Sequence, residues 1–222
     1  MRKSLLMAAL AAAVVGGALG CGGKGGVKPA PPSVSTFTDS RDGQVYKIVQ
    51  IGSQSWFAEN LSYAADGSVC YDNKDANCSK YGRLYNFSTA KDACPAGYHL
   101  PNQDEWVTLF DYIVGESGDW YDDLYEVGKK LKSKTGWKDK GNGTNEYGFS
   151  ILPGGDYDDD IEFCCAGYVG GLWSTTVYDH YPDRVWSLRL QATGTILNMT
   201  TADTTIFLSV RCVADNRKEA QK

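Results

Sequence analysis

The sequence is poor in the residues from which most enzyme active sites are built. It contains two histidines in 222 residues, His99 and His180, and both have only generic neighbours. It lacks a G-x-S-x-G motif, which removes the nucleophile elbow of the α/β-hydrolases as a candidate. His99 is a candidate base or metal ligand. Because no second histidine lies nearby in the chain, we interpret it instead as a hydrogen-bonded loop or core residue.

An excess of basic residues is also lacking. Lys and Arg number 22 against 27 Asp and Glu, so the formal net charge is −5 at pH 7. Proteins that bind nucleic acid neutralise its phosphates with a basic surface, and this composition argues against such a surface. Nucleic acid is therefore excluded as an expected partner.

The N-terminal apolar run is too short for a typical membrane span. Arg2 and Lys3 precede apolar residues 5–15, whereas a spanning helix needs about 20 residues. We therefore expect residues 1–20 to be a cleaved export signal. The A-L-G-C sequence at its end resembles a bacterial lipobox, in which Cys21 is lipidated after cleavage and anchors the chain in a membrane. The alternative, a plain secretory signal, would leave this cysteine unpaired outside the cell.

Composition divides the rest of the chain into three segments. Residues 21–36 are Gly, Pro, Lys and Ser with almost nothing to bury, so the lipidated cysteine is expected to lead into a flexible tether. Residues 37–214 have a globular composition, and about 180 residues suit one domain. Residues 215–222 form a charged tail. Gly22 after the cysteine resembles lipoproteins sorted to an outer membrane, so we expect a place in the cell envelope, at the outer membrane or the cell surface.

The globular segment is rich in Gly, Trp and Tyr and has short apolar runs, which favours a loop-rich α+β domain. Alternation and turn signals predict strands over residues 45–50, 55–58, 172–176, 184–190, 195–199 and 206–213. Helical periodicity predicts helices over residues 102–114 and 121–134. The solvated side of the second helix is expected to carry Lys129, Lys130, Lys132 and Lys134.

The first of these helices has the better start signal. Asn102 and Glu105 have the spacing of a capping box, in which each side chain accepts from the other residue's backbone N–H. Pro101 keeps the preceding residue extended, so the helix cannot begin earlier. The apolar residues that follow share one stripe: Trp106, Leu109, Phe110, Ile113 and Val114. This stripe is expected to face the core.

The strand predicted over residues 206–213 alternates most clearly. Cys212 belongs to the set expected to face the core, and Arg211 belongs to the set on the opposite face.

Six cysteines remain when Cys21 is set aside, an even number that implies disulfides in an exported chain, with fifteen possible connectivities. Cys70 and Cys78 bracket a polar loop and are expected to pair. We also expect Cys94 to pair with Cys212, which would join the long helix to the last strand. Adjacent Cys164 and Cys165 form either a vicinal disulfide or two thiols. A zinc site at this pair is disfavoured because no C-x-x-C motif or nearby histidine supplies further ligands.

Eight motifs carry a family resemblance. They are I-G-x-Q-x-W-x-A-E-N-L (51–61), C-Y-D-N ending in C (70–78), Y-G-R-L-Y (81–85), A-C-P-x-G-Y-H-L-P-x-x-x-E-W (93–106), G-K-K-L-K-S (128–133), Y-G-F-S-x-L-P-G-G (147–155), L-W-S-T-T (172–176) and S-V-R-C-V (209–213). Together they resemble the Fibrobacter succinogenes major paralogous domain. That family occurs in exported and lipid-anchored bacterial surface proteins.

The family is similar, in its G-F-S-x-L-P-G-G and V-R-C-V parts, to the formylglycine-generating-enzyme and C-type-lectin-like superfamily. The resemblance implies an α+β fold of the C-type-lectin-like or sulfatase-modifying-factor-like type, with helices packed beside a twisted antiparallel sheet and long disulfide-tied loops. Formylglycine-generating enzymes use paired cysteines near the end of the domain, and only Cys212 is present there. We therefore name no catalytic residue and favour a non-enzymatic protein, with an enzyme of that type or a hydrolase as the alternative.

An acidic run is the candidate metal site. It comprises Asp156, Asp158, Asp159, Asp160 and Glu162. Carboxylates this close together suit Ca²⁺, the one cofactor considered, although their spacing is not that of an EF-hand and the lectin-type E-P-N signature is absent. The alternative is a solvated acidic loop.

Aromatic residues near loops are the candidate ligand-binding site. They are Trp120, Trp137, Tyr157, Tyr168, Trp173, Tyr178 and Tyr181. Planar rings stack on sugar faces while neighbouring polar groups bind the hydroxyls, so polysaccharide is the expected ligand class and another surface protein the alternative partner. The competing interpretation is that these rings cover a core. The sequence thus favours a surface domain for adhesion or ligand binding, with a structural envelope protein as a further alternative.

Overall fold

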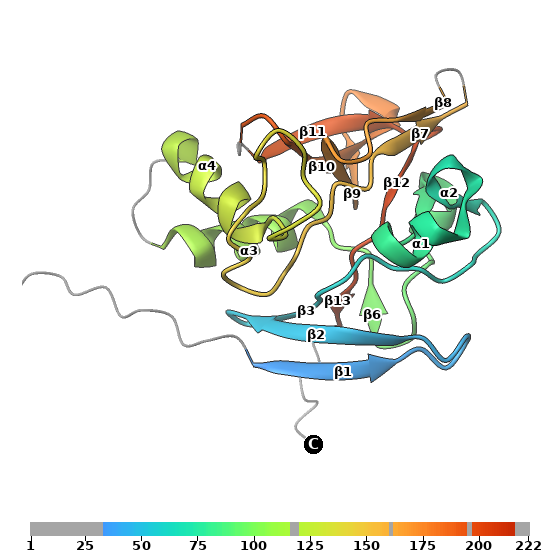
Figure 1. Cartoon of the computed structure of the whole chain (residues 1–222), viewed down its shortest axis with the longest axis horizontal. Coiled ribbons are helices and arrows are strands. Elements are labelled where there is room, and N and C mark those ends of the chain that lie inside the picture. Colours follow the sequence, from blue (N-terminus) through green and yellow to red (C-terminus); the bar gives the residue numbers. More distant parts are fainter. Residues whose placement is uncertain (1–32, 116–119, 160–161, 195–196, 216–222) are drawn as a thin grey trace, which may run out of the picture. The chain divides into compact units, whose positions relative to one another are not determined.

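The structure is a computed structural model that describes residues 33–115, 120–159, 162–194 and 197–215. Strands dominate its described part and form two sheets (Figure 1). The five-stranded sheet has the order β1 (Val34–Thr38), β2 (Val45–Ile51), β3 (Gln54–Phe57), β13 (Val213–Ala214) and β6 (Tyr98–His99). All pairings within this sheet are antiparallel.

The eight-stranded sheet is built around one long hairpin. Its main path is β11 (Asn198–Asp203), β10 (Tyr181–Gln191), β9 (Val169–Tyr178), β12 (Phe207–Ser209), β5 (Leu84–Asn86) and β4 (Ser68–Val69). A short hairpin of β7 (Asp156–Asp158) and β8 (Glu162–Cys164) joins it by pairing with β12. The strands β9 and β10 are the longest of the described part, and they pair to form a hairpin.

The described helices lie outside the sheets. They are the 3₁₀ helix η1 (Tyr71–Asn73) and the α-helices α1 (Asp75–Tyr81), α2 (Phe87–Ala90), α3 (Gln103–Val114) and α4 (Trp120–Leu131). In Figure 1, α3 and α4 lie together on one side of the sheets, and α1 and α2 lie on the other. None of the described helices combines the length and apolar character needed to cross a membrane.

The predicted α+β, C-type-lectin-like fold class is wrong. Strand accounts for 37% and helix for 20% of the described residues, and the architecture is two sheets rather than helices packed beside one sheet. The error has a physical origin. Several strands have only two or three residues, such as β4, β6 and β13, and a period of two cannot be recognised over so short a segment. The two long helices, by contrast, show their periodicity plainly.

The capping box of α3 is confirmed. The side chain of Asn102 accepts from the backbone N–H of Glu105 at 2.9 Å, and the Glu105 carboxylate accepts from the N–H of Asn102 at 2.9 Å. Trp106 and Leu109 are fully buried, and Phe110 and Ile113 are also in the core. The sequence therefore located both the start and the inner face of this helix correctly.

In the described part of the chain, the buried side chains form two core clusters. One combines both sheets with α3 and α4, and at its centre the rings of Trp56 and Trp106 stack with centroids 4.9 Å apart. The other includes Tyr46, Tyr85 and Trp173, which come from both sheets. Each cluster therefore contains side chains from both sheets, which pack the two sheets together.

The last predicted strand divides between the two sheets. The prediction of one strand over residues 206–213 is wrong because β12 ends at Ser209 and β13 begins at Val213. In the crossing segment, the carbonyl groups of Val210 and Cys212 accept from the N–H groups of Leu61 and Phe57 at 2.9 Å each. The crossing segment thus bonds to the end of β3 and to the loop after it.

Arg211 lies in this crossing segment and is fully buried. Its guanidinium donates to the carbonyl groups of Phe57 (3.1 Å) and Phe149. It also donates to the side-chain oxygen of Asn60 at 2.7 Å and to the carbonyl of Ser150 at 3.3 Å. Burial lowers the pKa of Arg211 to about 9, so the side chain remains charged at neutral pH. One buried cation therefore connects three separate segments of the chain.

Lys132 corrects the prediction for the second helix. It was expected on the solvated side, but it lies just after α4 with its side chain fully buried. Its Nζ donates to the carbonyl of Gln191 at 2.8 Å and lies 4.0 Å from the centroid of the Trp137 ring. Desolvation lowers the pKa of Lys132 to about 8. The helix ends before this position, so helical spacing does not predict which way the residue faces.

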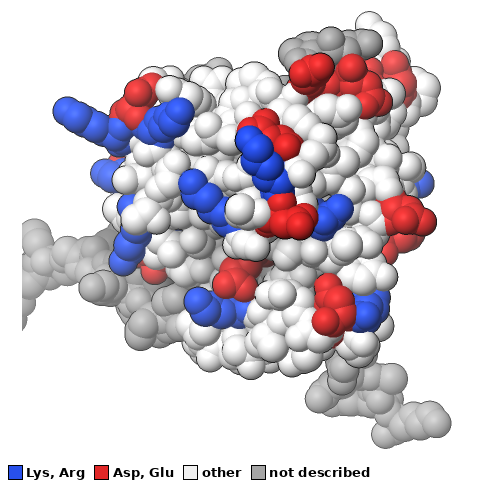
Figure 2. Space-filling view, turned by 45° about the vertical axis from the view of Figure 1, so that its right-hand side comes forward, with Lys and Arg blue, Asp and Glu red and all other residues white. Residues whose placement is uncertain are grey.

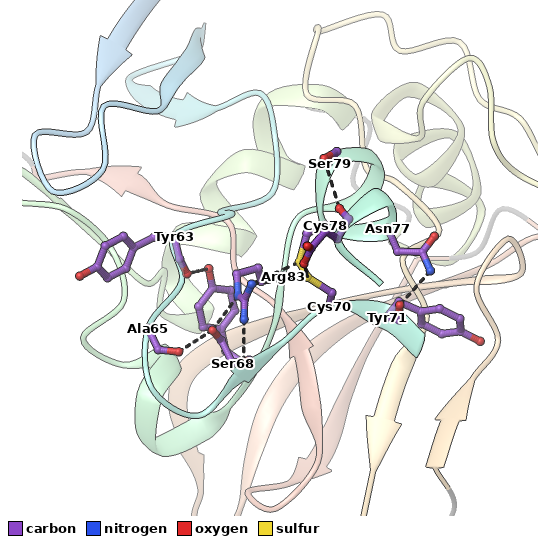
Figure 3. The surroundings of a disulfide bond; sticks show 11 residues. Tyr63, Ala65, Ser68, Cys70, Tyr71, Asn77, Cys78, Ser79 and Arg83 are labelled. Atoms are coloured by element: carbon purple, nitrogen blue, oxygen red, sulfur yellow. Dashed lines mark hydrogen bonds between the residues drawn. A yellow bond between two sulfur atoms is a disulfide. The ribbon is translucent and has the colours of Figure 1, made fainter. Parts of the chain in front are cut away.

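The predicted pairs Cys70–Cys78 and Cys94–Cys212 are both present as disulfides. The first closes the loop around η1 and α1, where Arg83 donates to Ser68 at 2.8 Å and lies 3.4 Å from the Cys70 sulfur (Figure 3). The second closes a separation of 118 residues and contributes about 4 to 5 kcal/mol on the chain-entropy model. It holds the crossing segment to the loop before α3.

We predict that replacing Arg211 by Met lowers the free energy of unfolding by about 3 to 5 kcal/mol, because its buried oxygen partners lose their donor. Urea unfolding followed by tryptophan fluorescence measures the change. The control is Arg184→Met, because Arg184 is exposed and its loss is expected to change stability by about 0.5 kcal/mol or less. Equal effects of the two substitutions would contradict the role assigned to Arg211.

Candidate functional site

Aromatic side chains gather at the end of the β9–β10 hairpin. We call Tyr178, His180, Tyr181 and Trp186 the aromatic patch. The rings of Tyr178 and Tyr181 are stacked, with centroids 6.0 Å apart and an interplanar angle of 9°. The ring of Trp186 meets Tyr178 edge-on at 5.5 Å, and the His180 ring also lies 5.5 Å from Tyr178. The contacts among these rings hold them in a fixed arrangement at the surface.

The hairpin explains why these rings come together. Tyr178 is the last residue of β9 and Tyr181 the first of β10, and the two pair across the turn. Tyr181 is 58% exposed and Tyr178 is half-buried. Trp186 is half-buried and stands opposite Thr201 of the neighbouring strand. The patch therefore offers flat apolar faces to solvent from a rigid two-stranded support.

Hydrogen-bonding groups border the aromatic patch. Asp179 lies in the turn, and Asp183 and Arg184 follow Tyr181 on β10, and all three are exposed. Arg184 donates to the hydroxyl of Thr201 at 3.4 Å. Flat rings edged by carboxylates and a guanidinium supply the two kinds of contact that a sugar needs, stacking and hydroxyl binding.

Two of the predicted ligand-binding aromatics are core residues, so that prediction is wrong for them. Trp173 is fully buried and donates to the carbonyl of Tyr85 at 2.7 Å. Trp137 is 5% exposed and donates to Ser133 and to the carbonyl of Ile151. Trp173 lies within the central strand β9, where a long side chain packs into the core, and loop proximity alone did not distinguish this position.

Of the other predicted aromatics, Tyr178 and Tyr181 form the stacked pair of the aromatic patch, whereas Tyr157 and Tyr168 do not belong to it. Tyr168 is 40% exposed, lies just before β9 and has the ammonium of Lys138 4.7 Å from its ring centroid. Tyr157 packs against Phe163 on the β7–β8 hairpin, with centroids 4.5 Å apart. The side chain of Trp120 lies outside the described residues. Trp186 was not among the predicted ligand-binding aromatics, because it lies within the strand predicted over residues 184–190. Its position five residues after Tyr181 was the signal that could have identified it.

Two cavities lie beside the β7–β8 hairpin. One cavity of about 360 Å³ and a second of about 260 Å³ share Asp158, Arg189 and Ile206 in their linings. Arg189 and Asp156 both line the second cavity, and they form an ion pair in which Nη1 and Oδ2 are 2.8 Å apart. The hydrogen bond from Tyr157 to Asp159, with a smaller effect of desolvation, raises the pKa of Tyr157. Figure 2 shows acidic side chains gathered at the upper right, whereas the rest of that face mixes both charges.

The acidic run does not bring its described carboxylates into one cage. Among the described residues, three metal-binding side chains lie within 4.8 Å of one another in a single group: Asp156, Cys164 and Cys165. Only Asp156 belongs to the acidic run. Asp160 lies outside the described residues, so the calcium site stays a prediction.

Cys164 and Cys165 form a disulfide with each other, one of the two states left open by the sequence. Cys164 ends β8 and pairs in register with Asp156 of β7. Cys165 has a left-handed backbone with φ of 73°, and its carbonyl accepts from Tyr168 and Val169 at 2.9 Å. Both cysteines are half-buried. Cys212 is fully buried and bonded to Cys94, so it does not provide a free thiol.

His99 is hydrogen-bonded at both ring nitrogens, as its interpretation as a hydrogen-bonded loop or core residue predicts, although it lies in strand β6 and not in a loop. Nδ1 lies 2.7 Å from Asp215 and Nε2 lies 2.8 Å from Glu105, the capping residue of α3. Burial lowers the pKa of His99, but the hydrogen bonds with Asp215 and Glu105 outweigh this effect, and the pKa is raised. His99 therefore joins the end of the described chain to the start of α3.

We predict that His99→Gln lowers the melting temperature more at pH 5.5 than at pH 8.5. A raised pKa in the folded state means that the stabilisation is complete below the unfolded value of about 6.5 and is lost as pH rises through the folded value. Thermal unfolding at the two pH values measures it, with His180→Gln as the control. A loss of stability that grows toward alkaline pH would contradict the carboxylate-paired histidine.

Comparison with known proteins gives one match. The model of the family described as the Fibrobacter succinogenes major domain matches residues 49–214. No curated protein matches the chain, and no solved structure matches it. The likeness to formylglycine-generating enzymes is not shown by these comparisons.

Proposed function

Because the chain belongs to the Fibrobacter succinogenes major domain family, which is consistent with a surface protein, we propose that it is a lipid-anchored domain of the cell surface that binds polysaccharide through the aromatic patch. The observation that carries this proposal is the stacked pair Tyr178–Tyr181, held at the tip of the longest hairpin beside Trp186. Such an arrangement costs little conformational entropy on binding, since the rings are already packed against one another.

The shape of the patch favours a sugar chain over a small compact ligand. The rings of Tyr178 and Tyr181 lie nearly parallel, and Tyr181 is more than half exposed. Sugar rings have apolar faces that pack against such surfaces, while exposed Asp183 and Arg184 are placed to bind hydroxyl groups. A polymer extends along a surface of this kind and does not need an enclosing pocket.

The N-terminal sequence supports export and anchoring. Residues 1–20 have the features of a lipoprotein signal, and Cys21 is the lipidation site in this proposal. Strand β1 begins at Val34, so the last three residues of the predicted tether, 34–36, belong to the folded domain. A domain attached in this way can reach polymers outside the membrane.

The proposal predicts that the full chain binds one or more members of a panel of cellulose, xylan and soluble glycans. Tyr181→Ala should weaken that binding roughly fivefold, as expected for the loss of one aromatic contact worth about 1 kcal/mol. Affinity gels and titration calorimetry measure the change, with and without Ca²⁺.

The matched control is Tyr168→Ala. Tyr168 is also exposed, but it lies at the opposite end of β9 from Tyr178, about 30 Å away at about 3.3 Å per residue. Binding that is flat across the panel would sink the proposal and favour a structural envelope protein, as would equal losses from the two tyrosine substitutions.

Anchoring is tested separately. We predict that Cys21→Ser moves the protein from the membrane fraction to the soluble fraction of cells that express it, because the acyl chains are then lost. Fractionation and intact-protein mass spectrometry measure the change. Wild-type protein that carries no lipid mass would contradict the anchor while leaving the binding proposal untouched.

A further inference from the structure

The β7–β8 hairpin brings together a carboxylate and two sulfur atoms. Asp156 and Cys164 stand opposite each other in the strand register, and Cys165 is the next residue of the chain. Their ligand atoms lie within 4.8 Å of one another. The proposed polysaccharide binding makes no use of this cluster, because the aromatic patch lies at the far end of β9.

The surroundings hold the cluster in place. Gly155 has a positive φ of 73°, and a Cβ atom there would collide with the carbonyl of Cys164. Its N–H donates to the carbonyl of Val169 at 2.8 Å. Because Gly155 precedes Asp156, this close approach fixes the strand that carries the carboxylate against the strand that carries the sulfur atoms.

Charge and access both suit a cation once the sulfur atoms are thiolates. Two thiolates and the Asp156 carboxylate carry three negative charges, and Arg189, paired with Asp156, carries one positive charge. The sum of −2 matches a divalent ion. Asp156 and Cys164 line the cavity of about 260 Å³, so a further coordination position faces solvent.

We propose that Cys164 and Cys165 are a reducible pair and that, once reduced, their sulfur atoms and the Asp156 carboxylate form a three-ligand site for a thiophilic divalent cation such as Zn²⁺ or Cd²⁺. This inference is independent of the polysaccharide proposal. It also revises the argument from motif spacing against zinc, since the additional ligand comes from a neighbouring strand rather than from a nearby histidine.

The chemistry balances with a low-molecular-weight thiol as the reductant. Two thiol molecules are oxidised to one disulfide, the Cys164–Cys165 bond is broken, and two protein thiols are formed. Binding of the cation then releases the two thiol protons to solvent. Zn–S bonds of about 2.3 Å in a tetrahedral site require the two sulfur atoms to be about 3.8 Å apart, so the metal holds the pair open.

The test uses the full chain with Cys21→Ser, so that no thiol outside the disulfides interferes. Graded reduction by dithiothreitol, followed by alkylation and peptide mapping, is expected to open Cys164–Cys165 while Cys94–Cys212 stays closed, because Cys212 is fully buried. The selectively reduced protein is then titrated with Cd²⁺. The expected result is one ion per chain with a thiolate-to-cadmium absorption band, and no such band for the oxidised protein.

Matched variants separate the ligands from their surroundings. Asp156→Asn should lower cadmium affinity at least tenfold. Arg189→Gln breaks the same ion pair but leaves all three ligands, and Glu162→Gln changes an exposed carboxylate of the same hairpin, so both should retain the band and the stoichiometry. Joint replacement of Cys164 and Cys165 by Ser should abolish both.

Three results would overturn the site. They are a pair that resists reduction until the whole protein unfolds, a reduced protein without one-to-one binding, and an affinity that Asp156→Asn leaves unchanged. None of these measurements involves a polysaccharide, so failure of this site and failure of the proposed function are distinguishable.

Discussion

The buried guanidinium of Arg211 is the interaction on which the joining of the two sheets depends. It has no carboxylate partner among the hydrogen bonds and ion pairs of the described residues. Its two terminal nitrogens donate to backbone carbonyls and to one amide oxygen instead, while its Nε is buried without a hydrogen bond to any described residue. Those acceptors come from the end of β3, from the loop after it and from the segment around Phe149. A buried cation tolerates little displacement, because each lost acceptor leaves a charge in an apolar interior. The chain is therefore held at the point where it passes from one sheet to the other.

The neighbours of Arg211 reinforce the same crossing. Cys212 is bonded to Cys94, and the backbone carbonyls on both sides of Arg211 accept from the end of β3 and from the loop after it. Asn60 accepts from Arg211 and donates to the carbonyl of Tyr81, which extends the contact to the end of α1. The fixed crossing segment follows β12, which pairs with the central strand β9. The hairpin of β9 and β10 is thereby supported near one end, while its other end lies in solvent.

The two surface features that we connect with function lie at opposite ends of β9. The aromatic patch stands at Tyr178, and the Cys164–Cys165 pair precedes Val169 by a few residues, with Val169 N–H bonded to the Cys165 carbonyl at 2.9 Å. One end is apolar and flat, which suits a sugar polymer. The other end has the Asp156 carboxylate beside the sulfur atoms of Cys164 and Cys165, which suits a soft cation once the disulfide is reduced. Both are positioned by strands rather than by long loops, so their geometry is fixed before a ligand arrives.

The sequence by itself determined the features that depend on local chemistry or on pairing logic: the capping box of Asn102 and Glu105, the inner face of α3, two disulfides, and membership of the family on motifs that span most of the domain. Only the tertiary structure decided the two-sheet architecture, the burial of Lys132 and Trp173, and the place of Arg211. Strands of two or three residues carry no readable period, and a side chain's exposure depends on which distant segment covers it. The meeting of Tyr178 with Trp186, and of Asp156 with Cys164, likewise follows from strand register, which residue spacing alone did not reveal.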